Sequence, residues 1–277
     1  MIVRKFLRAA ATVAVRCFLR LPGSGRFVER LVTASMDRMV TATHKGQTMK
    51  FVGANHLCHY RAESFSTKEP DTLEWIETIP EGSVLWDVGA NVGLYSIYAA
   101  KQRKCRVYAF EPSVFNLEVL ARNIFANNLQ DFVTIVPVAL TDELGVNLFQ
   151  MTSTNWGGAL STFGKEVDQN GQEITPIFEY RTVGVSMSDA VSRLGIPCPN
   201  FIKIDVDGIE HFVLKGGHDV LKEVDSVLVE INDDFDEQAV ISAKRLENAG
   251  LRLHRKRHMV GAQHNQWWIR SSQKAEN

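Results

Sequence analysis

Two neighbouring segments carry residues whose types and spacing suit a nucleoside cofactor. The first, residues 84–93, is an apolar run that ends in Asp87, Gly89 and Gly93 before a helical pattern begins. Such a run is typical of a buried strand that turns tightly into a helix, whose free N–H groups can face a polar ligand. The next predicted strand ends in Glu111, which lies 22 residues after Gly89. An acidic residue at an offset of about 20 residues reaches the ribose hydroxyls of a bound nucleoside.

The glycine spacing distinguishes between two kinds of nucleoside cofactor. The turn Gly89-Ala90-Asn91-Val92-Gly93 lacks the Gly-x-Gly-x-x-Gly pattern that brings backbone against a pyrophosphate, and Asp87 would place negative charge near one. S-adenosylmethionine has no phosphate and carries an amino group and a sulfonium, so an acidic turn suits it. The alternative is an ordinary glycine-rich turn that holds no ligand. The residues predicted to bind the cofactor are Asp87, Gly89, Ala90, Asn91, Gly93, Glu111, Pro112 and Asp142.

Three ionisable residues of a later predicted strand form the candidate catalytic group. Lys203, Asp205 and Asp207 alternate with isoleucine and valine, so their side chains should project from one face of the strand. The carboxyl end of such a strand opens into the ligand cleft of a parallel sheet. Burying the three groups unpaired would be costly. The alternative is therefore an ion pair of Lys203 with Asp205 or Asp207 that only organises the strand end.

The elements that must position these residues follow from the apolar pattern. Helical patterns follow the first, second, fourth and fifth predicted strands, which indicates a mostly parallel sheet with helices on both faces. The last two strands are joined without a helix and should form an antiparallel hairpin at the sheet edge. We therefore predict an α/β, Rossmann-like fold with a mostly parallel seven-stranded sheet and an antiparallel edge strand, the architecture of class I S-adenosylmethionine methyltransferases. The predicted strands are 84–88, 106–111, 132–138, 201–206, 226–231, 251–256 and 265–270.

Four segments together carry a family resemblance: residues 87–93, residues 110–112, Asn123 and, above all, the stretch from Ile202 to Glu210. From Lys68 to Ile231 the chain resembles the FkbM family of S-adenosylmethionine-dependent methyltransferases. This family is linked to O-methylation of hydroxyls on sugars and natural products.

The resemblance implies roles for the candidate catalytic group. Asp205 would lie beside the transferred methyl and orient or deprotonate the acceptor hydroxyl, with Lys203 setting its charge. The commonest family motif has Glu where this chain has Asp207, whose side chain is one methylene shorter. The segment Lys68-Glu69-Pro70 resembles one found in family members associated with polysaccharide biosynthesis.

The long interval from Thr141 to Asn200 is predicted to shape the substrate site, because insertions over strand ends commonly do so. Within it, Trp156 stands beside two glycines and is either a sugar-stacking platform or the anchor of a loop. Glu210 begins a predicted helix, which it caps, or it binds substrate. The residues predicted to bind substrate are Trp156, Glu210 and Glu230.

A magnesium ion is a possible second cofactor. Glu230 and Asn232 end the fifth predicted strand on one face, and with Asp205 they would form a set of oxygen ligands. Carboxylates at strand ends are common in this architecture without any metal. Metal ligands are therefore left unassigned.

The segment before the cofactor motif is predicted to consist of two parts. Residues 1–40 form a basic helical extension, and residues 41–82 lead into the methyltransferase domain at 83–272. In residues 1–21, apolar positions recur at helical spacing while arginines occupy another face, so this is neither a signal peptide nor a membrane span. The helix could lie on an anionic membrane surface, but packing against its own domain or a second subunit is favoured.

The lead-in part carries two local predictions. The stretch from Thr41 to Tyr60 has a strand-like pattern. The next segment predicts a helix with Pro70 at its first position and with Leu73 and Ile76 facing inward.

Composition narrows the function class. The 277 residues contain 45% hydrophobic residues and a net charge of −1, which argues against a partner that is nucleic acid. The four cysteines are scattered, which indicates reduced thiols and a cytoplasmic, at most membrane-peripheral, protein. We predict an O-methyltransferase acting on a hydroxyl of a sugar or glycan, as in polysaccharide biosynthesis. The alternatives are a methyltransferase of a small natural product, a nicotinamide-dependent oxidoreductase and a non-catalytic scaffold.

Overall fold

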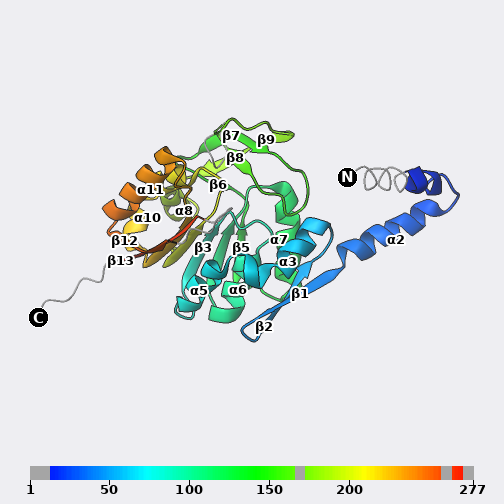
Figure 1. The fold of residues 1–277 in the computed structure, drawn as a ribbon, viewed down its shortest axis with the longest axis horizontal. Coiled ribbons are helices and arrows are strands. Elements are labelled where there is room, and N and C mark those ends of the chain that lie inside the picture. The colour runs from blue at the N-terminus through cyan, green and yellow to red at the C-terminus, as the bar shows by residue number, and fades with distance from the viewer. Residues whose placement is uncertain (1–12, 166–171, 257–263, 271–277) are drawn as a thin grey trace, which may run out of the picture.

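The protein is built around a central mixed β-sheet. The computed structural model describes residues 13–165, 172–256 and 264–270. The described chain forms this sheet from seven strands in the order β12-β13-β11-β10-β3-β4-β5 (Figure 1). All seven predicted strands are present, and the predicted fold class is confirmed. Their bounds are β3 (Val84–Val88), β4 (Arg106–Phe110), β5 (Val133–Val136), β10 (Phe201–Ile204), β11 (Ser226–Glu230), β12 (Leu251–Lys256) and β13 (Asn265–Arg270).

The strand directions agree with the predicted hairpin at one edge. β10, β3, β4 and β5 pair in parallel, as do β10 and β11. β13 is antiparallel to both of its neighbours, β11 and β12, and so lies between them. Every residue of β3 is buried, as expected for a parallel strand that is covered on both faces.

Helices cover both faces of the sheet. Because side chains alternate along a strand, Leu85 of β3 enters one hydrophobic core and Trp86 enters the other. The first core includes α5 (Pro70–Thr78), α6 (Leu94–Arg103) and α7 (Val114–Ala126). The second core includes residues of α8 (Met187–Ser192), α9 (Glu210–Lys215), α10 (His218–Glu223) and α11 (Asp236–Asn248).

The long insertion builds a sheet of its own, which the sequence pattern did not predict. It has four strands in the order β6-β9-β7-β8 and lies above the central sheet in Figure 1. Phe149 and Phe163 form a small core with Ile209 beneath it. The strands are β6 (Ala139–Leu140), β7 (Gly145–Met151), β8 (Ser161–Phe163) and β9 (Phe178–Val185).

The lead-in segment is a hairpin followed by short helices. β1 (Met39–His44) pairs antiparallel with β2 (Gln47–Val52), and α3 (His56–Glu63) and α4 (Phe65–Lys68) follow. The strand prediction was wrong after Val52, because the Asn55 side chain accepts a hydrogen bond from the Cys58 N–H and so caps α3.

The helix α5 agrees with its prediction. Pro70 occupies its first turn, and Leu73 and Ile76 are buried. The fixed backbone of proline is suited to that position.

Helix α2 (Ser24–Met36) projects from the body of the molecule (Figure 1). Of the helix predicted at 1–21, residues 1–12 lie outside the described residues. Residues 13–18 are helical and exposed. Packing of this part against its own domain is therefore not observed. Within the described chain, no helix is long and apolar enough to cross a membrane.

Candidate active site

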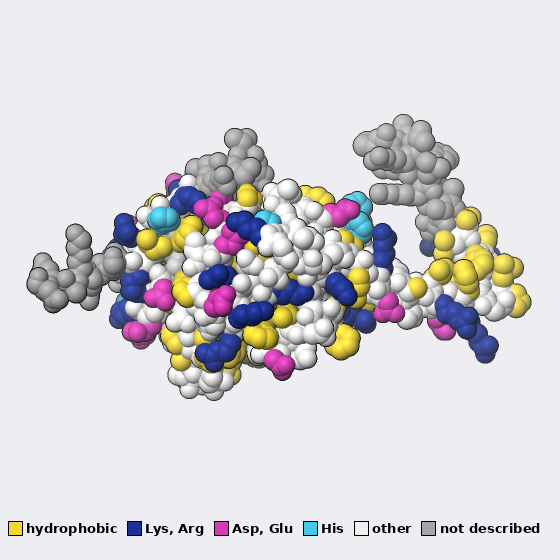
Figure 2. Space-filling view, turned by 90° about the horizontal axis from the view of Figure 1, so that it is seen from below, with side chains coloured by type: hydrophobic (Ala, Val, Ile, Leu, Met, Phe, Trp, Pro, Cys, Tyr) yellow, Lys and Arg dark blue, Asp and Glu magenta, His cyan; other side chains and the backbone are white. Residues whose placement is uncertain are grey.

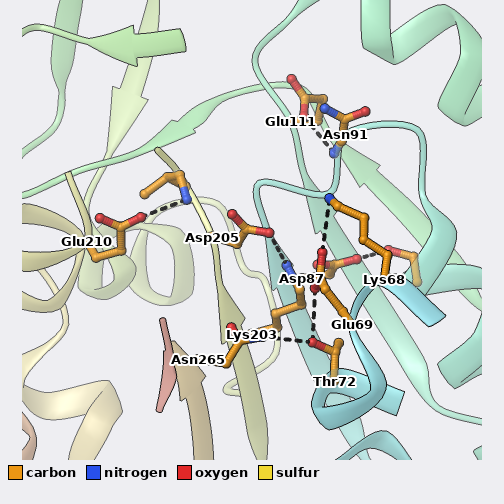
Figure 3. A network of polar contacts seen from close by, with 12 residues as sticks. Lys68, Glu69, Thr72, Asp87, Asn91, Glu111, Lys203, Asp205, Glu210 and Asn265 are labelled. Carbon is orange, nitrogen blue, oxygen red and sulfur yellow. Dashed lines mark hydrogen bonds and ion pairs between the residues drawn. The ribbon is translucent and has the colours of Figure 1, made fainter. Parts of the chain in front are cut away.

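One cavity opens at the carboxyl ends of the central strands. Its volume of about 550 Å³ is in the range of small-molecule sites. One part, here called the turn half, is lined by Gly89–Val92 and Glu111–Ser113. The other part, here called the carboxylate half, is lined by Lys68, Glu69, Lys203, Asp205, Glu230 and Asn265 (Figure 3).

Glycine at position 89 brings the two halves into contact. Gly89 has φ 81°, and a Cβ built on it would lie 1.8 Å from the backbone oxygen of Asp205. Asn91 is also left-handed, with φ 51°. Gly93 has φ 82° and begins α6, where a Cβ would lie 2.4 Å from a Leu120 methyl. The first glycine therefore lets the turn approach β10, and the second permits helix packing.

Glu111 ends β4 and faces the turn. Its two carboxylate oxygens accept the backbone N–H groups of Asn91 at 2.7 Å and Ser113 at 2.8 Å. Burial raises the pKa of Glu111 to about 7, although these hydrogen bonds favour the ionised form. The Asn116 side chain also hydrogen-bonds to this carboxylate, which still has acceptor capacity for a ligand hydroxyl. The lining carboxylate and the cavity beside Gly89 therefore fit a nucleoside such as that of S-adenosylmethionine.

Asp87 lies behind the cavity and does not line it. The buried carboxylate accepts a hydrogen bond from the Ser96 hydroxyl at 2.5 Å, and burial raises its pKa. Asp87 pairs in register with Lys203 of β10, and its charge helps to raise the pKa of that lysine. The structure thus places Asp87 as a charge partner within the sheet.

An ion pair lies at the end of β10. Lys203 Nζ is 2.8 Å from Asp205 Oδ2, with 4% of the lysine side chain and 28% of the aspartate side chain exposed. Burial would lower the pKa of Lys203, but the charges of Asp205, Asp87 and Glu69 outweigh it and raise the pKa. Burial would raise the pKa of Asp205, but Lys203 and a hydrogen bond with Glu230 lower it.

Glu230 and Asp205 are neighbouring carboxyl groups joined by a hydrogen bond. Burial and the neighbouring charge of Asp205 raise the pKa of Glu230 well above its usual range. Because two such carboxyl groups titrate as a pair, one proton is held between them at neutral pH. The sequence left two alternatives for Asp205, a structural ion pair with Lys203 or a catalytic group in the cleft. Both are compatible with this arrangement, because Asp205 is paired and also lines the cavity.

Among the lining residues that come from the lead-in segment, Lys68 and Glu69 belong to the carboxylate half and were not predicted as site residues. Lys68 Nζ lies 3.3 Å from Glu69 Oε1, and Glu69 accepts a hydrogen bond from the Thr72 hydroxyl at 3.0 Å. Asn265 of β13 reaches the same hydroxyl at 3.5 Å (Figure 3). The signal that could have identified them is the Lys68-Glu69-Pro70 segment, which the family resemblance already included.

A loop of the insertion is fastened over the turn half. The Asn91 side chain donates to the Gly158 carbonyl at 2.7 Å, and the Asn116 side chain donates to the same oxygen at 3.1 Å. From α3, Arg61 Nε donates to the Gly157 carbonyl at 2.8 Å. Four parts of the chain thus meet at this loop.

Trp156 belongs to this loop but is absent from the cavity lining. Its side chain is partly buried against the first hydrophobic core, and the Asn55 side chain donates to its carbonyl at 2.9 Å. Of the two alternatives for Trp156, these contacts fit the loop anchor, and its predicted place among the substrate-binding residues is not supported by the cavity lining.

Three other predicted site residues, Asp207, Asp142 and Glu210, make their polar contacts with other residues of the protein. Asp207, with φ 58°, lines the cavity but accepts the backbone N–H groups of Leu160 at 2.7 Å and Ser161 at 3.4 Å. Asp142 is outside the lining and pairs with Lys215 at 2.8 Å.

Glu210 is also outside the lining. Its buried carboxylate accepts the N–H groups of Val206 at 3.0 Å and Gly208 at 3.1 Å, and Gln238 donates to it as well. Burial raises its pKa to about 7. Asp142, predicted to bind the cofactor, and Glu210, predicted to cap its helix or bind substrate, thus lie outside the cavity lining, whereas Ala90, Pro112 and Glu230 do line the cavity.

The magnesium alternative has little support in the described part of the chain. That part holds no group of three or more His, Cys, Asp and Glu side chains suited to a metal. Asn232, one of the expected ligands, is outside the cavity lining, and its side chain accepts the Asp234 N–H at 3.0 Å.

The strand order and the site at the carboxyl ends of β3, β4 and β10 define a Rossmann-like, class I methyltransferase. The chain belongs to the methyltransferase FkbM domain family, whose model matches residues 87–260. It is an S-adenosylmethionine-dependent methyltransferase. This membership rules out the nicotinamide-dependent oxidoreductase and the non-catalytic scaffold as alternatives.

Two curated relatives are distant. The chain is 28% identical over 184 residues to the hexuronic acid methyltransferase AglP of Haloferax volcanii, covering 65% of this chain and 70% of that one. It is 27% identical over 174 residues to the 31-O-demethyl-FK506 methyltransferase FkbM of Streptomyces tacrolimicus, covering 55% and 66%.

Solved structures are still less similar. The structure of M. jannaschii TYW2 in complex with AdoMet has a TM-score of 0.43 and 14% identity, covering 84% of this chain and 87% of that one. The precorrin-6y C5,15-methyltransferase of Geobacter metallireducens has a TM-score of 0.42 and 15% identity, covering 73% and 87%. The fold assignment rests on the strand order and not on these likenesses.

Proposed function

We propose that this methyltransferase transfers a methyl group to a hydroxyl of a sugar or glycan, with Asp205 orienting that hydroxyl. The observation that carries the proposal is an ionised carboxylate that lines the cavity directly beside the cofactor turn. The Asp205 N–H donates to the Val88 carbonyl at 3.0 Å, and the missing side chain of Gly89 leaves the two segments in contact. A hydroxyl held by Asp205 would thus lie next to a cofactor held by the turn.

When bound, S-adenosylmethionine supplies an electrophilic methyl group. Glu111 would accept hydrogen bonds from its ribose hydroxyls, and the turn from Gly89 to Asn91 would hold another part of it. These assignments rest on the cavity lining and on the strand ends from which the residues project.

The charge state of Asp205 favours orientation over proton removal. Lys203 and Glu230 lower the pKa of Asp205, so the carboxylate is ionised at neutral pH but is a weak base. It accepts a hydrogen bond from the acceptor hydroxyl and directs an oxygen lone pair toward the methyl group. Positioning of reactants can remove roughly 7–11 kcal/mol of barrier, whereas a general base contributes about 10²–10⁴-fold. Orientation is therefore the larger effect that this site can supply.

The carboxylate half suits an acceptor with several hydroxyls. Lys68, Glu69, Glu230 and Asn265 place donors and acceptors around Asp205. Such a dense polar lining would leave buried groups unpaired against an apolar acceptor. The hexuronic acid methyltransferase relative supports a sugar, while the FK506 methyltransferase relative keeps a natural-product hydroxyl as the second candidate.

The test is transfer of a labelled methyl group to a panel of monosaccharides, uronic acids and nucleotide sugars, beside a panel of polyketide alcohols. A sugar product, with the label on an oxygen as located by NMR, supports the proposal. Products only from the alcohols would select the second candidate. A sugar product labelled on a carboxyl oxygen would overturn the assignment of a hydroxyl acceptor.

A further inference from the structure

The N-terminal arm, residues 13–36, presents apolar side chains to solvent. Residues 13–18 form a helical segment, and α2 follows after a turn at Pro22 and Gly23. Phe27 and Leu31, one helical turn apart, are each 52% exposed. Figure 2 shows hydrophobic side chains gathered on the projecting arm, with basic side chains at one border. The exposed apolar side chains include Phe18, Leu19, Leu21, Phe27, Leu31 and Val32.

Hydrogen bonds fasten the base of the arm to the body. At its base, the Arg38 carbonyl accepts the Gly53 N–H at 2.7 Å, and the Arg38 guanidinium lies 3.3 Å from the His59 ring. The Ser35 hydroxyl donates to the Ala54 carbonyl at 3.5 Å. These contacts fasten the end of α2 to the segment between β2 and α3 and leave the rest of the helix projecting.

The polar face of α2 is basic. At helical spacing Arg26 and Thr33 fall on the side opposite Leu31, and Arg30 borders the apolar face. Between residues 13 and 38 there are five arginines and only two acidic residues, Glu29 and Asp37. A wide apolar face bordered by arginines is the pattern of helices that lie in the plane of a membrane surface.

We infer that the arm, residues 13–36, binds an anionic lipid surface. Phe27 and Leu31 enter the region between head groups and acyl chains, while Arg26 and Arg30 contact lipid phosphates. The charge pattern selects this occupant over a second copy of the chain. A two-fold dimer would place the same patch on itself and so bring the arginine excess of one arm against that of the other.

The experiment is cosedimentation of the full chain with vesicles of phosphatidylcholine alone and of phosphatidylcholine mixed with phosphatidylglycerol. We expect binding to the anionic vesicles that weakens as salt is raised, because the Debye length shrinks to about 8 Å at physiological ionic strength. Arg26→Gln with Arg30→Gln should weaken binding by about 30-fold, since each basic residue contributes about fivefold near such a surface.

Matched variants separate the apolar face from the charge. Phe27→Glu and Leu31→Glu each add one negative charge to the apolar face and should abolish binding. Thr33→Glu adds the same charge to the polar face of the same helix and should weaken binding by about as much as the loss of one or two arginines. Circular dichroism of each variant checks that the helical content is kept.

Three results would overturn the inference. The first is that the wild-type chain stays in the supernatant with anionic vesicles. The second is that Thr33→Glu loses as much binding as Phe27→Glu. The third is a stable dimer in analytical ultracentrifugation that Phe27→Glu dissociates while vesicles do not compete with it, which would assign the arm to a second copy.

Discussion

The two halves of the cavity are built in different ways. The turn half comes from Gly89–Val92 and Glu111–Ser113, two short segments at the ends of adjacent strands, and its geometry is set by the backbone. The carboxylate half takes side chains from the lead-in helices, β10, β11 and β13. The cofactor part of a cavity can thus be formed by segments that are close in the sequence. The acceptor part is formed by segments that are far apart in the sequence and that only the folded sheet brings together. Substitutions in the two halves should therefore fail in different ways.

The largest effect is expected in the carboxylate half. Asp205→Asn keeps the shape but removes the charge that orients the hydroxyl, so turnover should fall by about 10²–10³-fold. The affinity for S-adenosylhomocysteine, measured by calorimetry, should stay within about twofold. Asp142→Asn is the matched control, because that aspartate is outside the cavity lining and should leave turnover intact. An Asp205→Asn enzyme with full turnover would remove Asp205 from the proposal.

The next largest effect is expected at Gly89, where the two halves of the cavity are in contact. Gly89→Ala adds a Cβ at 1.8 Å from the Asp205 carbonyl in a left-handed backbone. The backbone costs about 1–2 kcal/mol and the overlap about 1–3 kcal/mol, so S-adenosylhomocysteine affinity and turnover should both fall by about 30-fold or more. Gly82→Ala is the control, with φ 78° and nothing within 4 Å of its Cβ. Equal losses in the two variants would show that contact with β10 is unimportant.

Glu111→Gln should affect the turn half alone. Losing a charged acceptor for the ribose hydroxyls should weaken S-adenosylhomocysteine about tenfold or more at pH 8. Burial raises the pKa of Glu111 to about 7, so the wild-type carboxylate becomes protonated as the pH falls through that value. Ligand hydroxyls favour the ionised form, and wild-type affinity should therefore rise from pH 6 to pH 8 and then level off.

Calorimetry of S-adenosylhomocysteine binding to Glu111→Gln over the same pH range is the check. The affinity of this variant should not change between pH 6 and pH 8. A pH dependence that survives the substitution would assign it to another group. Turnover at saturating cofactor should change far less than in Asp205→Asn.

The smallest effect is expected at Asp207. Its carboxylate accepts the N–H groups of Leu160 and Ser161, so it positions the insertion over the cavity. Asp207→Asn keeps one acceptor oxygen and should change turnover by less than about fivefold, while Asp207→Ala should lower the free energy of unfolding by ~1–3 kcal/mol. Urea unfolding and steady-state kinetics measure the two. A loss of turnover as large as that of Asp205→Asn would make Asp207 a catalytic residue.

Much of the fold followed from the apolar pattern. All seven central strands and the edge hairpin were predicted, because buried parallel strands are short apolar runs bounded by turns. The sheet of the insertion and the start of α3 were not predicted. β7 and β9 carry many exposed residues, and Asn55 ends a strand-like pattern through a local capping bond that spacing does not reveal.

The candidate site divides in the same way. Gly89 and Glu111 line the cavity as expected, since their positions depend on one strand and its turn. Asp142 and Glu210 are carboxylates, as a binding site would require, but they contact neighbouring residues of the protein, namely Lys215 and Gln238. Residue type alone cannot separate a carboxylate that faces a ligand from one that satisfies buried backbone N–H groups.

By itself, the sequence determined the order of the strands along the chain, the cofactor turn and the ionisable cluster of β10, because periodicity and spacing are local properties. Only the tertiary structure decided that Glu230 shares its proton with Asp205, that Lys68 and Glu69 join them, and that Trp156 turns to the core. It also decided that α2 stands away from the body with its apolar face exposed. The physical reason is that pKa values, burial and charge pairing depend on which distant segments meet in space, and the packing of the whole sheet sets those meetings.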